Sequence, residues 1–382
     1  MKPYFTIPAD YSLETLKSCP DTELEIPVRE LHGSLKYSGF GCGRQETVMP
    51  DCEEAGFREY VKAAAERGMA FNYLMNAGCM SGEELTADGQ RRMSGWLEYL
   101  LDCGVRNITV TLPSLVEFIL LRYPAFRVYY SVIAGIDSVS RLRRLLGRRQ
   151  KVAGIYLHES VHRDMKRLRE ICGECRNRGI EVGMIVNVLC DIDCPWRQVH
   201  YSLVSHAMPG AKHTPYLWYY GTECKLRRLF DPKQALRLPW VRPDDIPMYL
   251  EAGVTRFKVG GRDLIKFGAD FWRTVADYNH RPFKGNLYPL FLCYAQVEHQ
   301  NLFHLDNGPR LSEYLAANFS GELHCQECDE CGKCSDLAET VAPDPAAREK
   351  LAAVYRQRFH DVMWLDSRIP GESGNQRGQP TG

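Results

Sequence analysis

The sequence repeats one unit, in which an amphipathic helix is followed by a glycine and then by a short apolar strand. Glycine reaches the left-handed backbone conformation that ends a helix and turns the chain back toward a sheet. The first unit has a helix over residues 53–67, Gly68 and a strand over residues 69–76. The pattern recurs at residues 83–112 around Gly104, at 163–189 around Gly179 and at 243–259 around Gly253.

Three further apolar runs, at residues 24–31, 126–133 and 152–157, indicate additional strands. Most of these strands are nearly continuous apolar runs, which is typical of parallel strands covered on both faces. Repeated helix–strand units favour either a closed (β/α)8 barrel or an open doubly wound sheet. No G-x-G-x-x-G motif follows a strand, which weakens the open, dinucleotide-binding alternative. The sequence therefore predicts an α/β fold, a TIM-like (β/α)8 barrel.

The periodic pattern also suggests how the chain is divided. We expect the barrel over residues 1–282, with an insertion near residues 201–240, where no strand pattern is evident. A small cysteine-rich C-terminal extension is expected over residues 283–366. The last residues, 367–382, are rich in glycine, proline and polar side chains and are expected to be disordered.

Charge and hydropathy limit the partners of the chain. Among 382 residues, 48 basic side chains balance 48 acidic ones, so no global field draws the protein to nucleic acid or to a membrane. The basic stretch at residues 141–151 resembles an RNA-binding face, but a solvated helix explains it equally well. No apolar run is long enough to span a bilayer, and the N-terminus lacks a secretory pattern. We therefore expect a cytoplasmic protein without a membrane partner, for which RNA binding has weak support.

The fifteen cysteines point to metal or redox chemistry, because reducing compartments disfavour structural disulfides. Four of them form a run with two residues between neighbours, at Cys325, Cys328, Cys331 and Cys334. This spacing resembles part of a ferredoxin-type cluster loop, and zinc is the rival occupant. Core packing does not explain the run, so we expect it to bind either an iron–sulfur cluster or zinc.

A second group of candidates comes from the ends of the expected strands. Reactive groups of a parallel barrel collect just beyond the C-terminal ends of its strands. Cys190 and Cys194 form a short loop stiffened by a proline, and they can reach two corners of a cluster. Cys79 and Cys224 are the best candidates to complete four ligands. The alternative is that these cysteines are free thiols.

Other polar residues are expected at the same mouth. His158 directly follows the expected strand 152–157, and Arg262 follows a pair of glycines. Arg197 and His200 follow the Cys190–Cys194 loop at helical spacing and could bind an anion or supply a proton. For Arg197, His200 and Arg262 the alternative is a solvated position without a catalytic role.

Four stretches, at residues 71–79, 130–145, 186–206 and 242–262, resemble the collagenase-like U32 peptidase family. The resemblance implies a TIM-like barrel and, as in several members, a [4Fe–4S] cluster that serves oxygen-independent hydroxylation. Cys190 and Cys194 match the paired cluster cysteines of the family, and Cys79 and Cys224 are looser matches. The chain departs from better-known members because it lacks their E-x-F-x2-G-[SA]-x-C-x4-G-x-C signature. This departure puts both direct peptidase activity and RNA substrates in doubt.

Three functions follow from these patterns. The first is iron–sulfur-dependent hydroxylation, or a related redox modification, of a small or an RNA- or peptide-borne substrate. It would use one [4Fe–4S] cluster or two, an electron donor protein, and Arg197, His200 and Arg262 to hold an anionic substrate or oxygen donor. The second is a U32-type peptidase, which would need the barrel cysteines with His158 or His200 as nucleophile and base. The third is a non-catalytic cluster-carrying subunit of a hetero-oligomer.

Overall fold

Eight parallel strands close into a barrel in the computed structural model, which describes residues 2–17, 24–36, 38–45, 48–147, 151–192, 194–206, 214–321 and 332–367. Every strand pairs with its sequence neighbours, and β1 pairs with β8 to complete the closure. The expected TIM-like barrel is therefore confirmed. The strands are β1 Tyr4–Pro8, β2 Val28–Gly33, β3 Ala70–Met75, β4 Asn107–Val110, β5 Arg127–Tyr130, β6 Gly154–Tyr156, β7 Glu181–Ile185 and β8 Arg256–Lys258.

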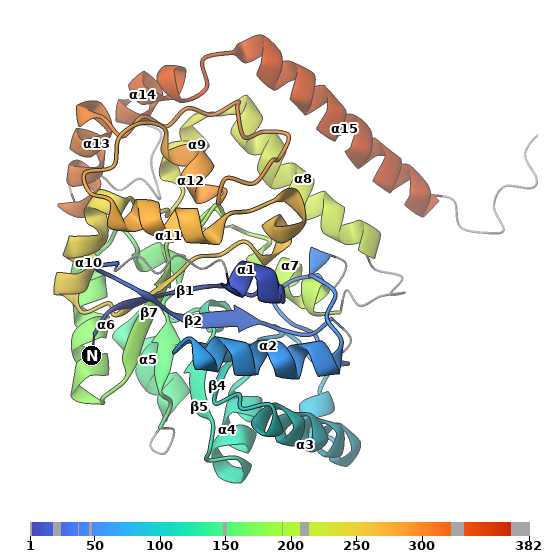
Figure 1. The fold of residues 1–382 in the computed structure, drawn as a ribbon. Coiled ribbons are helices and arrows are strands. Elements are labelled where there is room, and N and C mark those ends of the chain that lie inside the picture. Colours follow the sequence, from blue (N-terminus) through green and yellow to red (C-terminus); the bar gives the residue numbers. More distant parts are fainter. Residues whose placement is uncertain are drawn as a thin grey trace, which may run out of the picture.

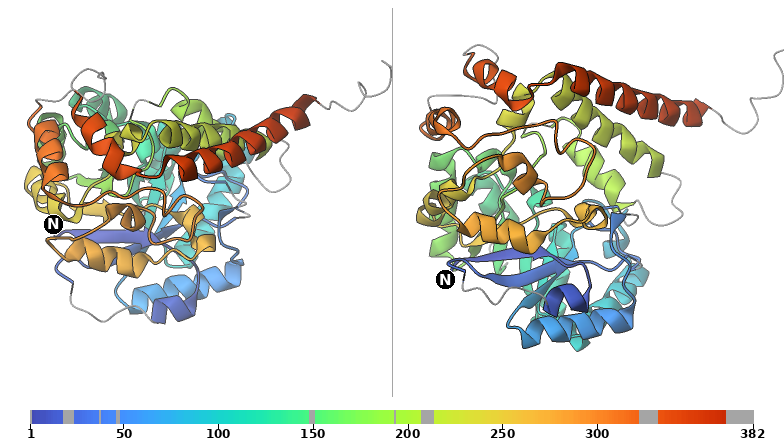
Figure 2. Two further views of the ribbon diagram at one scale, coloured as in Figure 1. Left: turned by 90° about the horizontal axis from the view of Figure 1, so that it is seen from above. Right: turned by 45° about the horizontal axis from the view of Figure 1, so that its top comes forward.

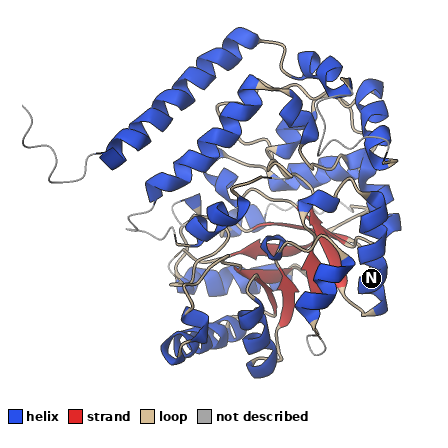
Figure 3. Cartoon of the chain, turned by 180° about the vertical axis from the view of Figure 1, so that it is seen from behind, coloured by secondary structure: helices blue, strands red, loops and turns tan. Residues whose placement is uncertain are grey.

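Helices surround the barrel and cover one of its ends (Figures 1 and 3). The outer ring follows the repeated unit and includes two helices after β7, namely α10, which contacts α6, and α11, which contacts β1. The longest helix of the described residues, α15, packs along α8 (Figure 2). The α-helices up to β7 are α1 Leu13–Lys17, α2 Glu54–Glu66, α3 Ala87–Asp102, α4 Pro113–Arg122, α5 Val139–Leu146 and α6 Met165–Asn177. Those after β7 are α7 Arg197–Ser205, α8 Thr214–Phe230, α9 Lys233–Arg237, α10 Ile246–Ala252, α11 Phe271–Asn279, α12 Leu287–Phe291, α13 Pro309–Phe319, α14 Lys333–Val341 and α15 Pro345–Ser367.

The glycines of the repeated unit end their helices as expected. Gly68, Gly104, Gly179 and Gly253 have φ angles of 72°, 90°, 67° and 111°. A side chain is strained in this backbone region, so glycine is the residue that fits there. The described part of the expected insertion, residues 201–240, consists of helical segments and their connections, with no strand.

The inside of the barrel is polar, whereas branched aliphatic side chains usually fill such barrels. Arg256 is completely buried, contacts Glu30 in a short ion pair, and lies 3.7 Å from Glu181. Its guanidinium carbon is 3.9 Å from the ring centroid of Tyr129. Arg127 binds the other side of Glu181 at 2.6 Å. Two arginines therefore balance two glutamates in the lower half of the barrel.

None of the helices in the described part of the chain has the length and apolar character that crossing a bilayer demands.

Replacing Arg256 with leucine tests the importance of this buried pair. Removing one partner leaves Glu30 charged and unpaired inside the barrel, so we expect the free energy of unfolding to fall by about 3–5 kcal/mol. Denaturant unfolding measures the change. Arg92→Leu is the control, because Arg92 is 46% exposed in its ion pair with Glu83, and should cost at most about 1 kcal/mol. Equal, small losses in both variants would contradict the role assigned to Arg256.

Candidate active site at the barrel mouth

A cavity of about 470 Å³ lies at the C-terminal ends of the strands. Its walls come from the residues that directly follow the strands, such as Asn76 after β3, Ser131 after β5 and Asn187 after β7. Lys225 of α8 and Tyr355 of α15 also line it, so these helices form its outer side. The position agrees with the place where barrel enzymes of this kind carry their active sites.

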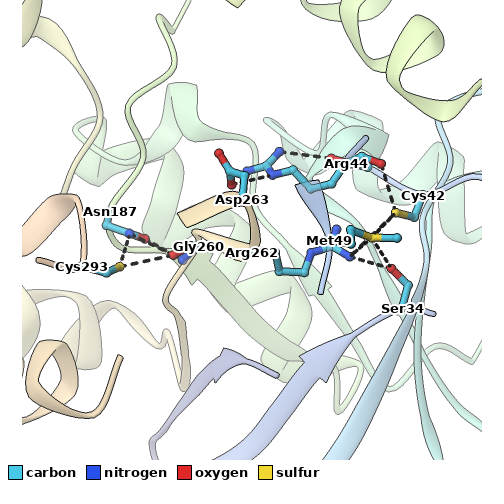
Figure 4. Close-up of polar contacts among 10 residues, drawn as sticks. Ser34, Cys42, Arg44, Met49, Asn187, Gly260, Arg262, Asp263 and Cys293 are labelled. Carbon is cyan, nitrogen blue, oxygen red and sulfur yellow. Dashed lines mark hydrogen bonds and ion pairs between the residues drawn. The ribbon is translucent and has the colours of Figure 1, made fainter. Parts of the chain in front are cut away.

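Arg262 is the most buried arginine on the cavity wall, with 6% of its surface exposed. It donates a hydrogen bond of 2.7 Å to Ser34 Oγ, and the same nitrogen lies 3.8 Å from the sulfurs of Cys42 and Met49 (Figure 4). All three partners are neutral groups. Among the described residues, no carboxylate forms an ion pair with Arg262. The guanidinium therefore keeps an unneutralised positive charge at the mouth.

Lys258, at the end of β8, adds a second basic side chain to the cavity wall. Its side chain is buried and its Nζ lies 5.0 Å from the ring centroid of Tyr156. Burial, followed by the charge of Arg262, holds the pKa of Lys258 well below its ordinary value. Beside it, burial and the charges of Lys258 and Arg262 lower the pKa of His32 well below its ordinary value. A neutral imidazole is thus expected next to these basic side chains.

The acidic groups of the cavity are largely paired. Glu159 forms a short ion pair with Arg197, which also donates to the carbonyl oxygen of Asp191 at 2.8 Å. Asp263 accepts from Arg44 Nε at 3.3 Å (Figure 4). Glu159 and Asp263 are therefore already bound to other arginines and do not neutralise Arg262.

Asn187 fixes the ends of β7 and β8 to each other (Figure 4). Its Oδ1 accepts from the backbone N–H of Gly260 at 2.6 Å, and its Nδ2 donates to the Gly260 carbonyl at 3.1 Å. The same Nδ2 donates to the carbonyl of Phe291 and lies 3.3 Å from Cys293 Sγ. One side chain therefore positions the backbone that leads into Arg262.

The loop that carries Cys42 and Arg44 lies directly against α7. A Cβ atom added to Gly41 would lie 1.9 Å from the carbonyl oxygen of Ser205, so only glycine fits this approach. On the other side of α7, the backbone N–H of Gly78 donates to Ser205 Oγ at 2.7 Å. The end of α7 is thus held between two loops of the mouth.

Three of the four cysteines expected at the mouth lie near one another. Burial foremost raises the pKa of Cys224 to about 12, and Cys190, Asp191 and Cys194 raise it further, which places these groups within electrostatic reach. Cys190 lines the cavity. The Cys190 side chain keeps surface accessible to solvent, but many protein atoms lie around it. The desolvation that they cause is the main reason why the pKa of Cys190 is raised.

Cys79 comes from a different loop of the mouth. It follows Gly78, whose backbone N–H donates to Ser205 Oγ in α7, whereas the carbonyl oxygen of Cys194 accepts from the N–H of Arg197 at the start of that helix. Among the described residues, no three His, Cys, Asp or Glu side chains are arranged as ligands of a metal ion. The described residues therefore fit a four-cysteine cluster only in part.

The cysteine run of the C-terminal extension falls mostly outside the described residues, which include neither Cys325, Cys328 nor Cys331. Cys334 is buried in α14, and its Sγ lies 3.6 Å from Arg237. The expected cluster or zinc site there stays a prediction.

The other residues expected at the mouth have different surroundings. Arg262 lines the cavity, while Arg197 acts on it through Glu159. His158 Nδ1 accepts from the N–H of Ser160 at 3.2 Å, and burial lowers its pKa. His200 stacks on Tyr220, and burial followed by nearby Arg44 and Arg197 lowers its pKa to about 4. Both imidazoles are thus expected to be neutral near pH 7.

Sequence reasoning missed Lys258, Arg44 and Asn187. Lys258 and Asn187 lie within or just after strands that were expected, so the rule on strand ends could have found them. Arg44 lies in a loop without periodicity, and no local pattern distinguishes it from a surface arginine.

Comparisons with known proteins give a relative from an archaeon and a similar solved structure. No protein-family model matches the chain. The chain is 28% identical over 327 residues to a Methanocaldococcus jannaschii protein named "Uncharacterized protease MJ1657", covering 82% of this chain and 91% of that protein. A solved structure, "The Structure of the U32 Peptidase Mk0906", aligns with a TM-score of 0.49 and 20% identity, over 68% of this chain and 93% of its own.

The contact between Gly41 and α7 predicts the effect of a single methyl group. Gly41→Ala should lower the free energy of unfolding by about 1–3 kcal/mol, because the loop with Cys42 and Arg44 must move away from Ser205. Thermal or denaturant unfolding measures the loss. Gly95→Ala in α3 is the matched control, since a Cβ there meets open space, and should stabilise the protein by up to about 1 kcal/mol. Stabilisation by both changes would show that the loop does not pack on α7.

Proposed function

We propose that the chain is an enzyme of the U32 peptidase family, whose active site is the cavity at the barrel mouth and whose substrate carries a carboxylate. The supporting observation is the unneutralised charge of Arg262. Keeping a buried guanidinium without an acidic partner costs desolvation free energy. A substrate carboxylate offsets that cost and accepts charge-assisted hydrogen bonds.

The surrounding residues favour an anion over a cation or a neutral molecule. Arg228 lines the same cavity as Arg262, and Asp263 is bound to Arg44. Cavities lined with one sign of charge concentrate ligands of the opposite sign. His32 is expected to be neutral, so its imidazole can donate a hydrogen bond to a bound anion without changing the charge of the cavity.

Peptide hydrolysis is one candidate reaction, because the archaeal relative is named a protease and the free C-terminus of a peptide supplies a carboxylate. A thiol nucleophile is not well supported at Cys190. Burial raises its pKa, and the charges that act on it come from Glu159, Arg197, Arg44 and Arg228. We therefore propose that the peptide bond of the substrate would bind in the cavity, and we do not assign Cys190 as the nucleophile.

An iron–sulfur redox modification, most concretely oxygen-independent hydroxylation, is the second candidate reaction. Cys190 lines the cavity and comes within electrostatic reach of Cys224, as does Cys194, which supports it because thiols are the usual ligands of such clusters. The cluster would supply electrons, while Arg262 would hold the anionic substrate. A fourth ligand would have to come from a residue outside this group.

Binding of lactate and its neutral analogue lactamide tests the proposed anionic substrate. Calorimetry should show tighter binding of lactate, and Arg262→Met should weaken lactate binding by about 1.5–3 kcal/mol, which corresponds to roughly tenfold or more. Arg92→Met changes an exposed arginine that does not line the cavity, so it is the control and should leave binding unchanged. Equal affinity for lactate and lactamide would contradict the proposal.

Iron and sulfide content of anaerobically prepared protein tests the second candidate. The double change Cys190→Ser and Cys194→Ser should remove the iron bound at the mouth. Cys52→Ser should not, because Cys52 precedes α2 and its nearby charge is Glu53. Unchanged iron in the double variant would assign any cluster to other cysteines.

A further inference from the structure

Lys258 occupies a fixed place inside the barrel mouth. In the strand ladders it lies opposite Thr6 of β1 on one side and Ile185 of β7 on the other. Its neighbour two positions earlier, Arg256, fills the barrel below it. Backbone pairing on both sides holds the Lys258 Cα more firmly than a loop would, which is what a reacting group requires.

The amine of Lys258 has no acidic partner among the described residues. Other described lysines do have one, as in the pair of Lys36 with Asp51 at 2.7 Å. Glu30 is the acidic group that acts on Lys258, but it is already bound to Arg256. The face of Tyr156 is the nearest aromatic surface. The amine is therefore not used in a structural ion pair.

The charged groups that face Lys258 come from several elements. Arg256 precedes it on β8, Arg262 follows it, Arg44 comes from the loop after β2, and Glu30 comes from β2. His32 on β2 is also within electrostatic reach and is expected to be neutral. Three cations against one paired carboxylate disfavour another ammonium ion at this place, and burial acts in the same direction.

A neutral amine that is desolvated next to other cations is the activated form of a lysine nucleophile. We propose that Lys258 forms an imine with the carbonyl carbon of a 2-oxo acid, whose carboxylate is held by Arg262. The inference rests on the proposed function, because it needs a carboxylate-bearing substrate in the same cavity.

The step is balanced without an oxidant or a reductant. The lone pair of Lys258 Nζ adds to the carbonyl carbon, and proton transfers convert the carbonyl oxygen into a leaving water molecule. A C=N bond replaces the C=O bond. Addition of water reverses the step and restores both the amine and the oxo acid.

The 2-oxo acid class follows from the proximity of the two groups. Lys258 and Arg262 line the same cavity at the C-terminal ends of the strands, so a small molecule in it can meet both side chains. A carboxylate bonded directly to the carbonyl carbon can contact both groups at once. A simple ketone lacks the carboxylate that Arg262 would bind. A 2-hydroxy acid lacks the ketone carbonyl group that Lys258 would attack.

Reductive trapping tests the inference on the full-length protein. Pyruvate with cyanoborohydride should add one reduced adduct per chain, which peptide mapping assigns to Lys258. Lys258→Arg should give no adduct at that position. Lys266→Arg is the matched control, because Lys266 is exposed after β8, and should be labelled like the unchanged protein. Labelling spread over surface lysines, with none at residue 258, would overturn the inference.

Two further arms separate this inference from the proposed function. Acetone should label Lys258 far less than pyruvate, and Arg262→Met, which keeps the lysine, should reduce pyruvate labelling to the acetone level. If lactate binds but pyruvate leaves no adduct, Lys258 is only an anion-binding cation and the inference is wrong while the proposed function stands. If neither lactate nor pyruvate binds, both are wrong.

Discussion

The ion pair between Arg256 and Glu30 inside the closed barrel sets the charge balance of the whole site. Both side chains are buried, and Glu181 with Arg127 completes a neutral set below the mouth. Because Glu30 is bound to Arg256, it is not free to neutralise Lys258 one layer higher. The positive charge of the mouth therefore stays unneutralised because the carboxylates below it are already paired with arginines.

The barrel itself could be predicted from the sequence because its physical causes are local. Glycines such as Gly68 and Gly179 stop helices, and continuous apolar runs indicate parallel strands covered on both faces. The strand β1 was missed because it has five residues and lies among prolines, so neither periodicity nor length distinguished it. Closure through β1 and β8 joins segments about 250 residues apart, which no local pattern reports.

The candidate site was only partly accessible to the same reasoning. Arg262 was expected at the mouth from the paired glycines before it, and it lines the cavity. Lys258 was missed because one lysine in a strand resembles an exposed edge residue until the barrel places it inside. Cys190, Cys194 and Cys224 come within electrostatic reach of one another, but no three of the described His, Cys, Asp or Glu side chains are arranged as metal ligands. Sequence spacing could not show how the loops orient these thiols.

The central claim is that an unpaired guanidinium at the end of β8 receives the carboxylate of the substrate. A crystal structure of the protein with bound lactate tests it most directly. The account predicts that the lactate carboxylate lies within hydrogen-bond distance of Arg262, between Ser34 and Lys258. A lactate bound elsewhere, or an acidic side chain of the protein paired with Arg262, would contradict it.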